Sequence, residues 1–339
     1  MLTKKSNLIF LLTLYTFFIV VVSNVNSNAK VIYVNMNNPD NFSKIQDAID
    51  NASDFDEIYV YNGTYFENLV INKSITLIGE NKDSTIIDAN YSYYGISLSN
   101  SIVNVSGFTI KNAIIGIYVS MNLSSQKMNS MINLFSNTIK NNNIGIYIEK
   151  DILNITLINN IIDNNTAEGI QLFGTKNVNA LSNKILHNKG FGLSLWNSSN
   201  NTIKNNIVTN SLKGVFLGEL SCFNIIENND ILKNSNSGIF FDNASYNTLD
   251  NNNFSSNDRG LSLYNSNYNL VANNKFNNNR IGIFLDASNE NDIDNNTFLK
   301  NEEDLVKRNN KFETPDFELF LVFSSILIIF LLQRRKYDQ

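Results

Sequence analysis

Short alternations of apolar and polar residues recur along most of the chain, and a glycine opens each of them. These glycines are Gly95, Gly116, Gly145, Gly169, Gly192, Gly214, Gly238, Gly260 and Gly282, at intervals of 21, 29, 24, 23, 22, 24, 22 and 22 residues. An asparagine column is steadier, spaced by 23 residues five times and then by 22 twice: Asn137, Asn160, Asn183, Asn206, Asn229, Asn252, Asn274 and Asn296. Two columns in phase at this period predict a repeat protein. The interval of 29 residues indicates an insertion in the second coil.

Each repeat holds three short alternations, separated by bends rich in asparagine, and this pattern predicts three short strands. Asparagine suits the bends because it tolerates left-handed backbone angles. When coils stack about 4.8 Å apart, equivalent asparagines can also hydrogen-bond along a ladder. We therefore predict an all-β, right-handed parallel β-helix of about 10 to 11 coils. A leucine-rich repeat has a similar period, but its L-x-x-L-x-L-x-x-N frame and helical return are absent here.

The N-terminal part of the body departs from the repeat. Residues 31–34, 57–61, 69–71 and 74–78 alternate as strands, whereas Phe42, Ile45, Ala48 and Ile49 share one helical face. A solenoid needs its open end sealed, so we expect this helix to cap the first coil. Residues 303–306 fall where another glycine repeat is due and are degenerate, so we expect the solenoid to end there.

The two ends of the chain have the sequence patterns of targeting segments. Residues 1–29 have the basic, apolar and small-polar order of a signal peptide. Residues 30–80 would then form the N-terminal cap and first coils, 81–306 the repeats and 307–316 a short linker. Residues 317–339 hold an apolar run followed by a basic tail, which predicts a membrane anchor or sorting signal with the β-helix outside. An exported protein held at the cell surface is the expectation.

Residues 42–50, 56–60 and 63–65, with Glu67, Asn68, Lys73 and Gly79, strongly resemble the opening of NosD-type "periplasmic copper-binding" β-helix proteins. The coils that follow resemble the same family and the related surface proteins of methanogenic archaea. The resemblance covers about residues 31 to 305 and implies the fold far more specifically than an activity. Residues 314–318 and the basic end resemble archaeal Pro-x-Phe sorting signals, although Asp316 stands where glutamate or glycine is commoner. Pectin methylesterases share the opening, but their catalytic glutamine and aspartate motifs do not follow it here.

Composition narrows the classes of partner. When the terminal residues Lys4, Lys5, Arg334, Arg335, Lys336 and Asp338 are left out, 21 basic residues face 30 acidic ones, which disfavours a nucleic-acid partner. Copper sites use His, Cys or Met ligands, and the chain offers His187, Cys222 and few methionines, of which Met121, Met128 and Met131 lie in the inserted segment. We therefore expect no copper site and no bound cofactor, although Ca²⁺ is compatible with the acidic residues. Sequons such as Asn243-Ala-Ser are hardly more frequent than this composition produces by chance, so glycosylation of some of them is expected only because the protein is expected to be exported.

The candidate binding and catalytic residues lie in the strands that follow the repeated glycines. In each of these strands the apolar residues should point inward and the residues between them outward, so two columns of side chains should face outward on one sheet. Their aromatic members are Phe173, Trp196, Phe216, Phe240, Tyr264 and Phe284, which we expect to form an exposed sugar-binding face. Asp242 and Asp286 lie two coils apart on it, hence about 9.6 Å between backbones, near the upper end of the carboxylate separation in inverting glycosidases.

Three hypotheses for the function follow. The first is a structural or ligand-binding envelope protein that contacts cell-envelope polysaccharide or surface proteins. The second is a polysaccharide lyase, epimerase or hydrolase that uses the outward sheet, with Asp242 and Asp286 as candidate catalytic residues. The third is a NosD-like accessory protein for metal-cofactor maturation, which the shortage of ligands disfavours. No motif in the sequence identifies a complete catalytic set, so the first reading is preferred.

Overall fold

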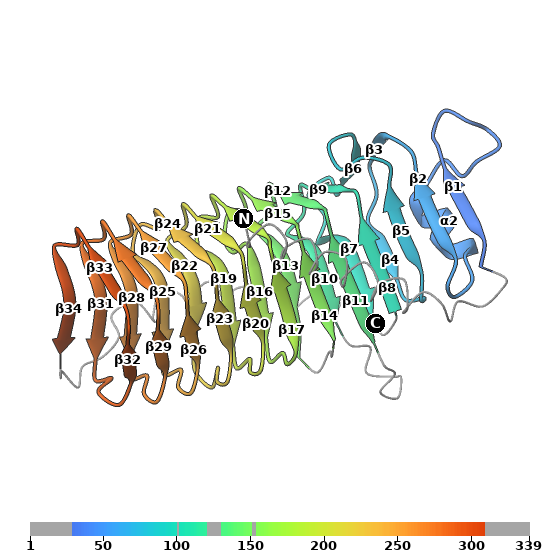
Figure 1. The fold of residues 1–339 in the computed structure, drawn as a ribbon. Helices are drawn as coiled ribbons and strands as arrows, with labels where there is room; N and C mark the ends of the chain where they lie inside the picture. Colours follow the sequence, from blue (N-terminus) through green and yellow to red (C-terminus); the bar gives the residue numbers. More distant parts are fainter. Residues whose placement is uncertain (1–28, 100–101, 121–129, 151–153, 309–339) are drawn as a thin grey trace, which may run out of the picture. The chain divides into compact units, whose positions relative to one another are not determined.

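The computed structural model describes residues 29–99, 102–120, 130–150 and 154–308. The expected signal peptide, membrane segment and most of the inserted segment lie outside the described residues. Within the described ranges, no helix is long and apolar enough to cross a membrane. The described chain winds into a stack of triangular coils whose strands form three parallel sheets (Figure 1).

The three sheets, here called A, B and C, each take one side of the triangle. Sheet A contains β1 (Val31–Val34), β2 (Glu57–Val60), β5 (Thr76–Gly79), β8 (Ile102–Ser106), β11 (Met131–Phe135), β14 (Ile155–Ile158), β17 (Val178–Leu181), β20 (Thr202–Lys204), β23 (Ile225–Glu227), β26 (Thr248–Asp250), β29 (Leu270–Ala272) and β32 (Asp292–Asp294). Sheet B contains β3 (Gly63–Tyr65), β6 (Thr85–Asp88), β9 (Thr109–Lys111), β12 (Thr138–Lys140), β15 (Ile161–Asp163), β18 (Lys184–Leu186), β21 (Ile207–Thr209), β24 (Asp230–Leu232), β27 (Asn253–Ser255), β30 (Lys275–Asn277) and β33 (Thr297–Leu299). Sheet C contains β4 (Leu69–Ile71), β7 (Tyr94–Ser99), β10 (Ile115–Ser120), β13 (Ile144–Ile148), β16 (Ile170–Phe173), β19 (Phe191–Trp196), β22 (Lys213–Leu217), β25 (Ser237–Asp242), β28 (Arg259–Tyr264), β31 (Ile281–Asp286) and β34 (Glu303–Arg308).

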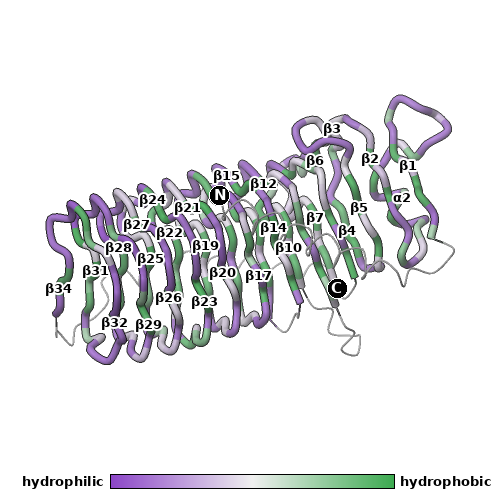
Figure 2. Tube along the Cα trace, in the orientation of Figure 1, coloured by the Kyte–Doolittle hydropathy of each residue, from purple (hydrophilic) through white to green (hydrophobic). Residues whose placement is uncertain are grey.

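The core is a set of aliphatic columns along the axis of the stack. In sheet C the register pairs Ile117, Ile146, Ile170, Leu193 and Val215 in successive coils, and all five are fully buried. Burial of one such side chain stabilises the fold by roughly 1.5–3 kcal/mol. The alternation of hydrophobic and hydrophilic residues along the strands is visible in Figure 2. A solenoid of this kind is therefore stabilised by contacts between neighbouring coils.

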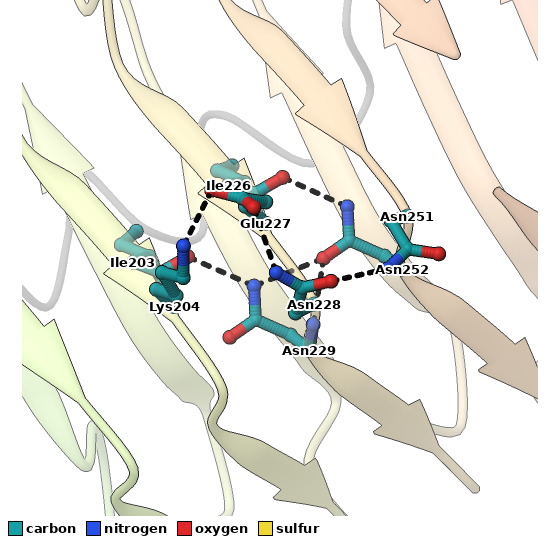
Figure 3. Close-up of polar contacts among 8 residues, drawn as sticks. All are labelled: Ile203, Lys204, Ile226, Glu227, Asn228, Asn229, Asn251 and Asn252. Atoms are coloured by element: carbon teal, nitrogen blue, oxygen red, sulfur yellow. Dashed lines mark hydrogen bonds and ion pairs between the residues drawn. The ribbon is translucent and has the colours of Figure 1, made fainter. Parts of the chain in front are cut away.

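Each corner between sheets A and B uses two adjacent residues with different roles. At one such corner, Asn228 has φ 57° and is half-exposed, whereas the next residue, Asn229, is buried. The Asn229 Oδ1 accepts a hydrogen bond from the backbone N–H of Asn206 at 2.8 Å. Its Nδ2 donates to the Ile203 carbonyl and to Asn252 Oδ1, both at 2.9 Å (Figure 3). The expected asparagine ladder is confirmed, but the left-handed turn is made by the residue before it.

The other two corners contain ladders that the sequence analysis missed. The corner between sheets B and C has the buried or half-buried ladder residues Asn142, Asn165, Asn188, Asn234, Asn257, Asn279 and Asn301, with Ser211 in place of one asparagine. The corner between sheets C and A has Asn201, Asn224, Asn247, Asn269 and Asn291. Buried asparagine amides thus satisfy backbone groups where the sheet hydrogen bonds stop.

The glycine column follows from close approach of successive coils. A Cβ on Gly145 would lie 2.5 Å from the carbonyl oxygen of Gly169 and 3.0 Å from Nδ2 of Asn165. Because both neighbours belong to the next coil and one of them is backbone, any side chain here would force the coils apart. The glycines therefore mark the point where sheet C begins in each coil.

Helix α2 (Ile45–Asn51) covers the N-terminal end of the core, as expected, and buries Ile45, Ala48 and Ile49. Glu67 accepts hydrogen bonds from the backbone N–H groups of Ile45 and Gln46, both at 2.9 Å, and so caps the start of the helix. Lys73 Nζ donates to three carbonyl oxygens at its end, of Ile49, Asp50 and Ala52. Phe42, expected on the same helical face, instead precedes the helix, where it forms a β-bridge with Val34.

The far end of the stack is formed by β32, β33 and β34. The degenerate segment 303–306 lies in β34, which pairs with β31 as the last strand of sheet C. The strand exposes charged side chains, including Glu303, Asp304 and Lys307, and charged residues on an edge strand disfavour pairing with another chain.

Candidate functional site

The outward side of sheet C brings together the residues that the sequence analysis selected. We call its outward side chains from β16 to β31 the aromatic face. Parallel register aligns Ser194, Phe216, Phe240, Ser262 and Phe284 in one column. The neighbouring column aligns Phe173 with Trp196, and Asp242 with Tyr264 and Asp286. A third outward column precedes the glycines and contains Phe191, Lys213, Ser237, Arg259 and Ile281.

The rings of the aromatic face are in contact from coil to coil. Ring centroids of Phe216 lie 4.7 Å from Phe191, 4.6 Å from Trp196 and 5.9 Å from Phe240. The series continues through Tyr264, 5.0 Å from Phe240, to Phe284, 5.5 Å from Tyr264. Such pairs stabilise one another by roughly 0.5–1.5 kcal/mol each beyond the area they bury. The face is thus a continuous strip of aromatic side chains along the solenoid.

The expected exposure of these rings is wrong for two of the six, Phe216 and Phe284. Phe173 is 44% exposed, but Phe216 and Phe284 are only 4% and 1% exposed. Trp196, Phe240 and Tyr264 are half-buried. Because the coil spacing is close to the ring-stacking distance, neighbouring rings cover one another.

Two cations lie among the rings. Lys213 Nζ is 3.8 Å from the ring centroid of Phe240, and the guanidinium carbon of Arg259 is 4.2 Å from that of Phe284. Arg259 Nη1 also donates a hydrogen bond to the Tyr264 hydroxyl at 2.6 Å. Arg280, which borders the face in sequence, instead forms an ion pair with Asp258 at 2.6 Å. Cations over ring faces orient both groups, so the face combines apolar rings with fixed positive charge.

Asp242 and Asp286 lie on the face as expected, separated by Tyr264 in the register. Burial raises the pKa of Asp242, against the lowering effects of Lys213 and of a hydrogen bond from Asn243. The Oδ1 atom of Asp286 is buried and accepts no hydrogen bond within the described part of the chain. A buried oxygen without a donor is costly unless a ligand or water supplies one. Among the described residues, the Asp286 carboxylate therefore keeps one oxygen without a donor, whereas Asp242 accepts a hydrogen bond from Asn243 Nδ2 at 2.7 Å.

One titratable group on this side of the sheet was missed. Glu168, directly before Gly169, is 4% exposed, and it accepts a short hydrogen bond from the Ser194 hydroxyl. Burial raises the pKa of Glu168 to about 8, with the Ser194 hydrogen bond opposing the shift. Glu168 lies three residues before the outward Gln171, so alternation alone does not place the two side chains on the same side of the strand. The signal for Glu168 was its position directly before Gly169, which is equivalent to that of Phe191 and Lys213 before their glycines.

The described residues do not fit a copper centre. His187 Nδ1 lies 2.9 Å from Asp163 Oδ1 on an exposed corner after sheet B, whereas Cys222 contacts Ser199 at a corner before sheet A. Across the described ranges, no three His, Cys, Asp or Glu side chains converge on one point. Met131 lies in β11, and the other two methionines of the inserted segment lie outside the described residues. The expected absence of copper stays a prediction, which titration tests.

Two protein families and one relative match parts of the chain in sequence. Residues 176–318 match the family described as periplasmic copper-binding protein (NosD), and residues 94–236 match the right-handed β-helix region. A cell surface glycoprotein of Methanothermus fervidus is 36% identical over 110 residues, which are 32% of this chain but only 18% of that protein.

Solved structures share the fold at low sequence identity. The A-module of a mannuronan C-5 epimerase from Azotobacter vinelandii aligns with a TM-score of 0.60 and 13% identity, over 80% of this chain and 93% of that one. The Dettilon tailspike protein gives 0.64 and 15%, over 79% and 62%, and a pectate lyase gives 0.57 and 15%, over 75% and 80%. These likenesses define the class: the protein is a right-handed parallel β-helix. The sequence matches, which each cover part of the chain, support a NosD-type right-handed β-helix protein.

Proposed function

We propose that the protein is exported to the cell surface and that its aromatic face binds a polysaccharide of the cell envelope. The observation that carries the proposal is the strip of contacting rings from Phe191 to Phe284, with Lys213, Arg259 and Asp242 set among them. Sugar rings have apolar C–H faces and hydroxyl edges, so they need aromatic surface together with charged hydrogen-bonding groups. A strip that runs along the solenoid suits a chain-like ligand.

Surface location is supported by two observations. The N-terminal sequence has the order of a signal peptide, and the partial relative in Methanothermus fervidus is a cell surface glycoprotein. The solved β-helices are similar in fold alone, so the sugar-binding proposal rests on the aromatic face and not on their activities.

A glycan array with the purified β-helix tests the proposal. Removal of a half-buried ring from the strip, in Trp196→Ala or Tyr264→Ala, should weaken binding by about tenfold, since a ring contact contributes about 1–1.5 kcal/mol. Tyr91→Ala is the matched control, because Tyr91 is 81% exposed and lies outside the face. Absence of binding to every envelope polysaccharide would remove the proposal, and so would equal loss in the control.

A second candidate function, a polysaccharide-active enzyme, is favoured by Glu168. With a pKa of about 8 this carboxyl is protonated at neutral pH and can act as a proton donor, as buried catalytic acids do. Product release that disappears in Glu168→Gln and in Asp242→Asn, while polysaccharide binding persists, would establish this function. Binding without product release in the unaltered protein would exclude it for the polysaccharides tested.

A further inference from the structure

A second aromatic series lies at the corner between sheets C and A, outside the aromatic face. Phe223, Tyr246 and Tyr268 occupy equivalent positions in successive coils, with φ angles of 57°, 62° and 57°. The two preceding coils have Asn177 and Asn200 there, also left-handed, with φ angles of 59° and 57°. Asparagine adopts this conformation readily, whereas a bulky residue does so only at a cost. The backbone conformation of this corner therefore does not require an aromatic residue.

These three rings stack and remain exposed. Their centroids are 5.6 Å apart for Phe223 and Tyr246, and 5.1 Å apart for Tyr246 and Tyr268. The side chains are 57%, 52% and 53% exposed. Three residues carry the left-handed penalty, but only two ring contacts form in return. Bulky residues in the left-handed conformation at an exposed corner are typical of a functional surface.

The apolar surface continues onto sheet A. Register aligns Ile225, Thr248 and Leu270 directly after the three rings, and Ile225 and Leu270 are 44% and 37% exposed. The strands that carry them, β23, β26 and β29, lie side by side (Figure 1). We call Phe223, Tyr246, Tyr268, Ile225 and Leu270 the turn patch. A contiguous exposed apolar patch with a polar rim is typical of an interaction surface.

The rim of the turn patch is acidic. Five carboxylates surround the patch, each aligned by strand register with a neighbouring coil or lying in the coil after the last ring. They are Glu227, Asp250, Glu290, Asp292 and Asp294. Lys204 adjoins them but is already paired with Glu227 at 3.0 Å. Charge complementarity therefore favours a partner with lysine and arginine around its contact surface. A second copy is disfavoured, because the chain has a net charge of −5 and a symmetric contact would oppose these carboxylates.

The acidic rim distinguishes the turn patch from the aromatic face, where Lys213 and Arg259 lie over the rings. The rings of the turn patch stack at interplanar angles of 23° and 13°, so they present a row of ring edges along which apolar side chains can pack. We propose that the turn patch docks a partner protein whose contact surface presents apolar side chains ringed by lysine and arginine. This inference concerns a different surface from the proposed polysaccharide site and does not depend on it.

Site-specific photo-crosslinking in cells that produce the full chain tests the inference. Thr248→p-benzoylphenylalanine places the reactive group within the turn patch, between Ile225 and Leu270 in the register. Tyr91→p-benzoylphenylalanine is the control, since Tyr91 is also left-handed, with φ 62°, and exposed elsewhere on the molecule. We expect one crosslinked protein from position 248 that is absent from the control, and its linked peptide should carry apolar residues beside lysine or arginine.

Two sets of variants make the result specific. The double variant Tyr246→Asn and Tyr268→Asn restores the residue that earlier coils use at this corner, so the fold should persist while the crosslink yield falls about tenfold or more. Charge reversal by Glu227→Lys and Asp250→Lys should lower the yield similarly, and a thermal unfolding midpoint checks that both variants are folded. Crosslinks to a second copy, to glycan alone or to the same products as the control would overturn the inference. An unchanged yield in the folded variants, or no product at all, would also overturn it.

Discussion

Replacement of one ladder asparagine tests how the coils are held together. Asn229→Ala removes an amide that joins three successive coils, through Asn206 and Ile203 on one side and Asn252 on the other. Asn206 Nδ2 keeps its bond to the Ala180 carbonyl, and Asn252 Oδ1 still accepts the backbone N–H of residue 229. The group that loses its ladder bond without a replacement is the Asn206 N–H, because Ile203 also pairs with β23 in the parallel sheet.

The magnitude follows from this one group. A buried polar group left without a partner costs about 1–3 kcal/mol, so the variant should lose about 1–3 kcal/mol of unfolding free energy. Asn228→Gly is the control one residue away, because Asn228 is half-exposed and has φ 57°. Glycine adopts this angle without a Cβ penalty, so the control should be neutral or more stable, by up to about 1 kcal/mol.

Chemical denaturation of both variants, with hydrogen exchange read at the Asn206 amide, measures the effect. The Asn229→Ala variant should show a lower denaturation midpoint and faster exchange at that amide. Asn228→Gly should retain the protection of the unaltered protein. If the two variants unfold within about 0.5 kcal/mol of each other, the ladder does not stabilise the coils as argued.

Three further outcomes are expected. Lys73→Met should lower stability by about 1.5–3 kcal/mol and open α2 to proteolysis, because the lysine caps three carbonyl groups. Lys82→Met removes only an ion pair with the exposed Asp83 and should change stability by less than about 0.5 kcal/mol. Burial raises the pKa of Glu168 to about 8 in the folded state, against an ordinary glutamate value of 4.5. The native state therefore binds more protons between these pH values, and stability falls as pH rises through that window. Glu168→Gln should abolish this slope between pH 5 and pH 9, and parallel melting curves for the two proteins would contradict the assignment. Copper titration of the described body should show no binding at micromolar levels, since its candidate ligands are dispersed.

The coil architecture could be predicted because its causes repeat. Close approach of coils requires the Gly145 and Gly169 column, and the ladder requires the Asn206 and Asn229 column, so both appear as fixed periods. The capping helix was also predictable from its apolar face. Phe42 was misplaced because a four-residue apolar pattern does not mark where a helix begins.

The candidate site was only partly predictable for two physical reasons. Alternation fixes which side of a strand a residue faces, so Trp196, Tyr264 and Asp242 were placed correctly. Exposure depends on how neighbouring side chains pack, so the burial of Phe216 could not be read from alternation. Lys213 was missed because it precedes a glycine, at a position that looked like part of the bend.

The turn patch was hidden for a related reason. Tyr246 and Tyr268 lie in segments that otherwise contain asparagine and serine, so they read as part of a bend. Their left-handed angles and mutual stacking become visible only when successive coils are superposed in three dimensions.

The central claim is that the aromatic face binds polysaccharide, and Trp196 reports on it directly because it is the only tryptophan in the chain. Its ring contacts Phe216 at 4.6 Å, within the strip proposed to hold the sugar. Titration of the purified β-helix with envelope polysaccharide should produce a saturable shift in tryptophan emission, and Tyr264→Ala should weaken the apparent affinity about tenfold. Polysaccharide binding that is detected calorimetrically but leaves the emission of Trp196 unchanged would place the ligand elsewhere and contradict the account.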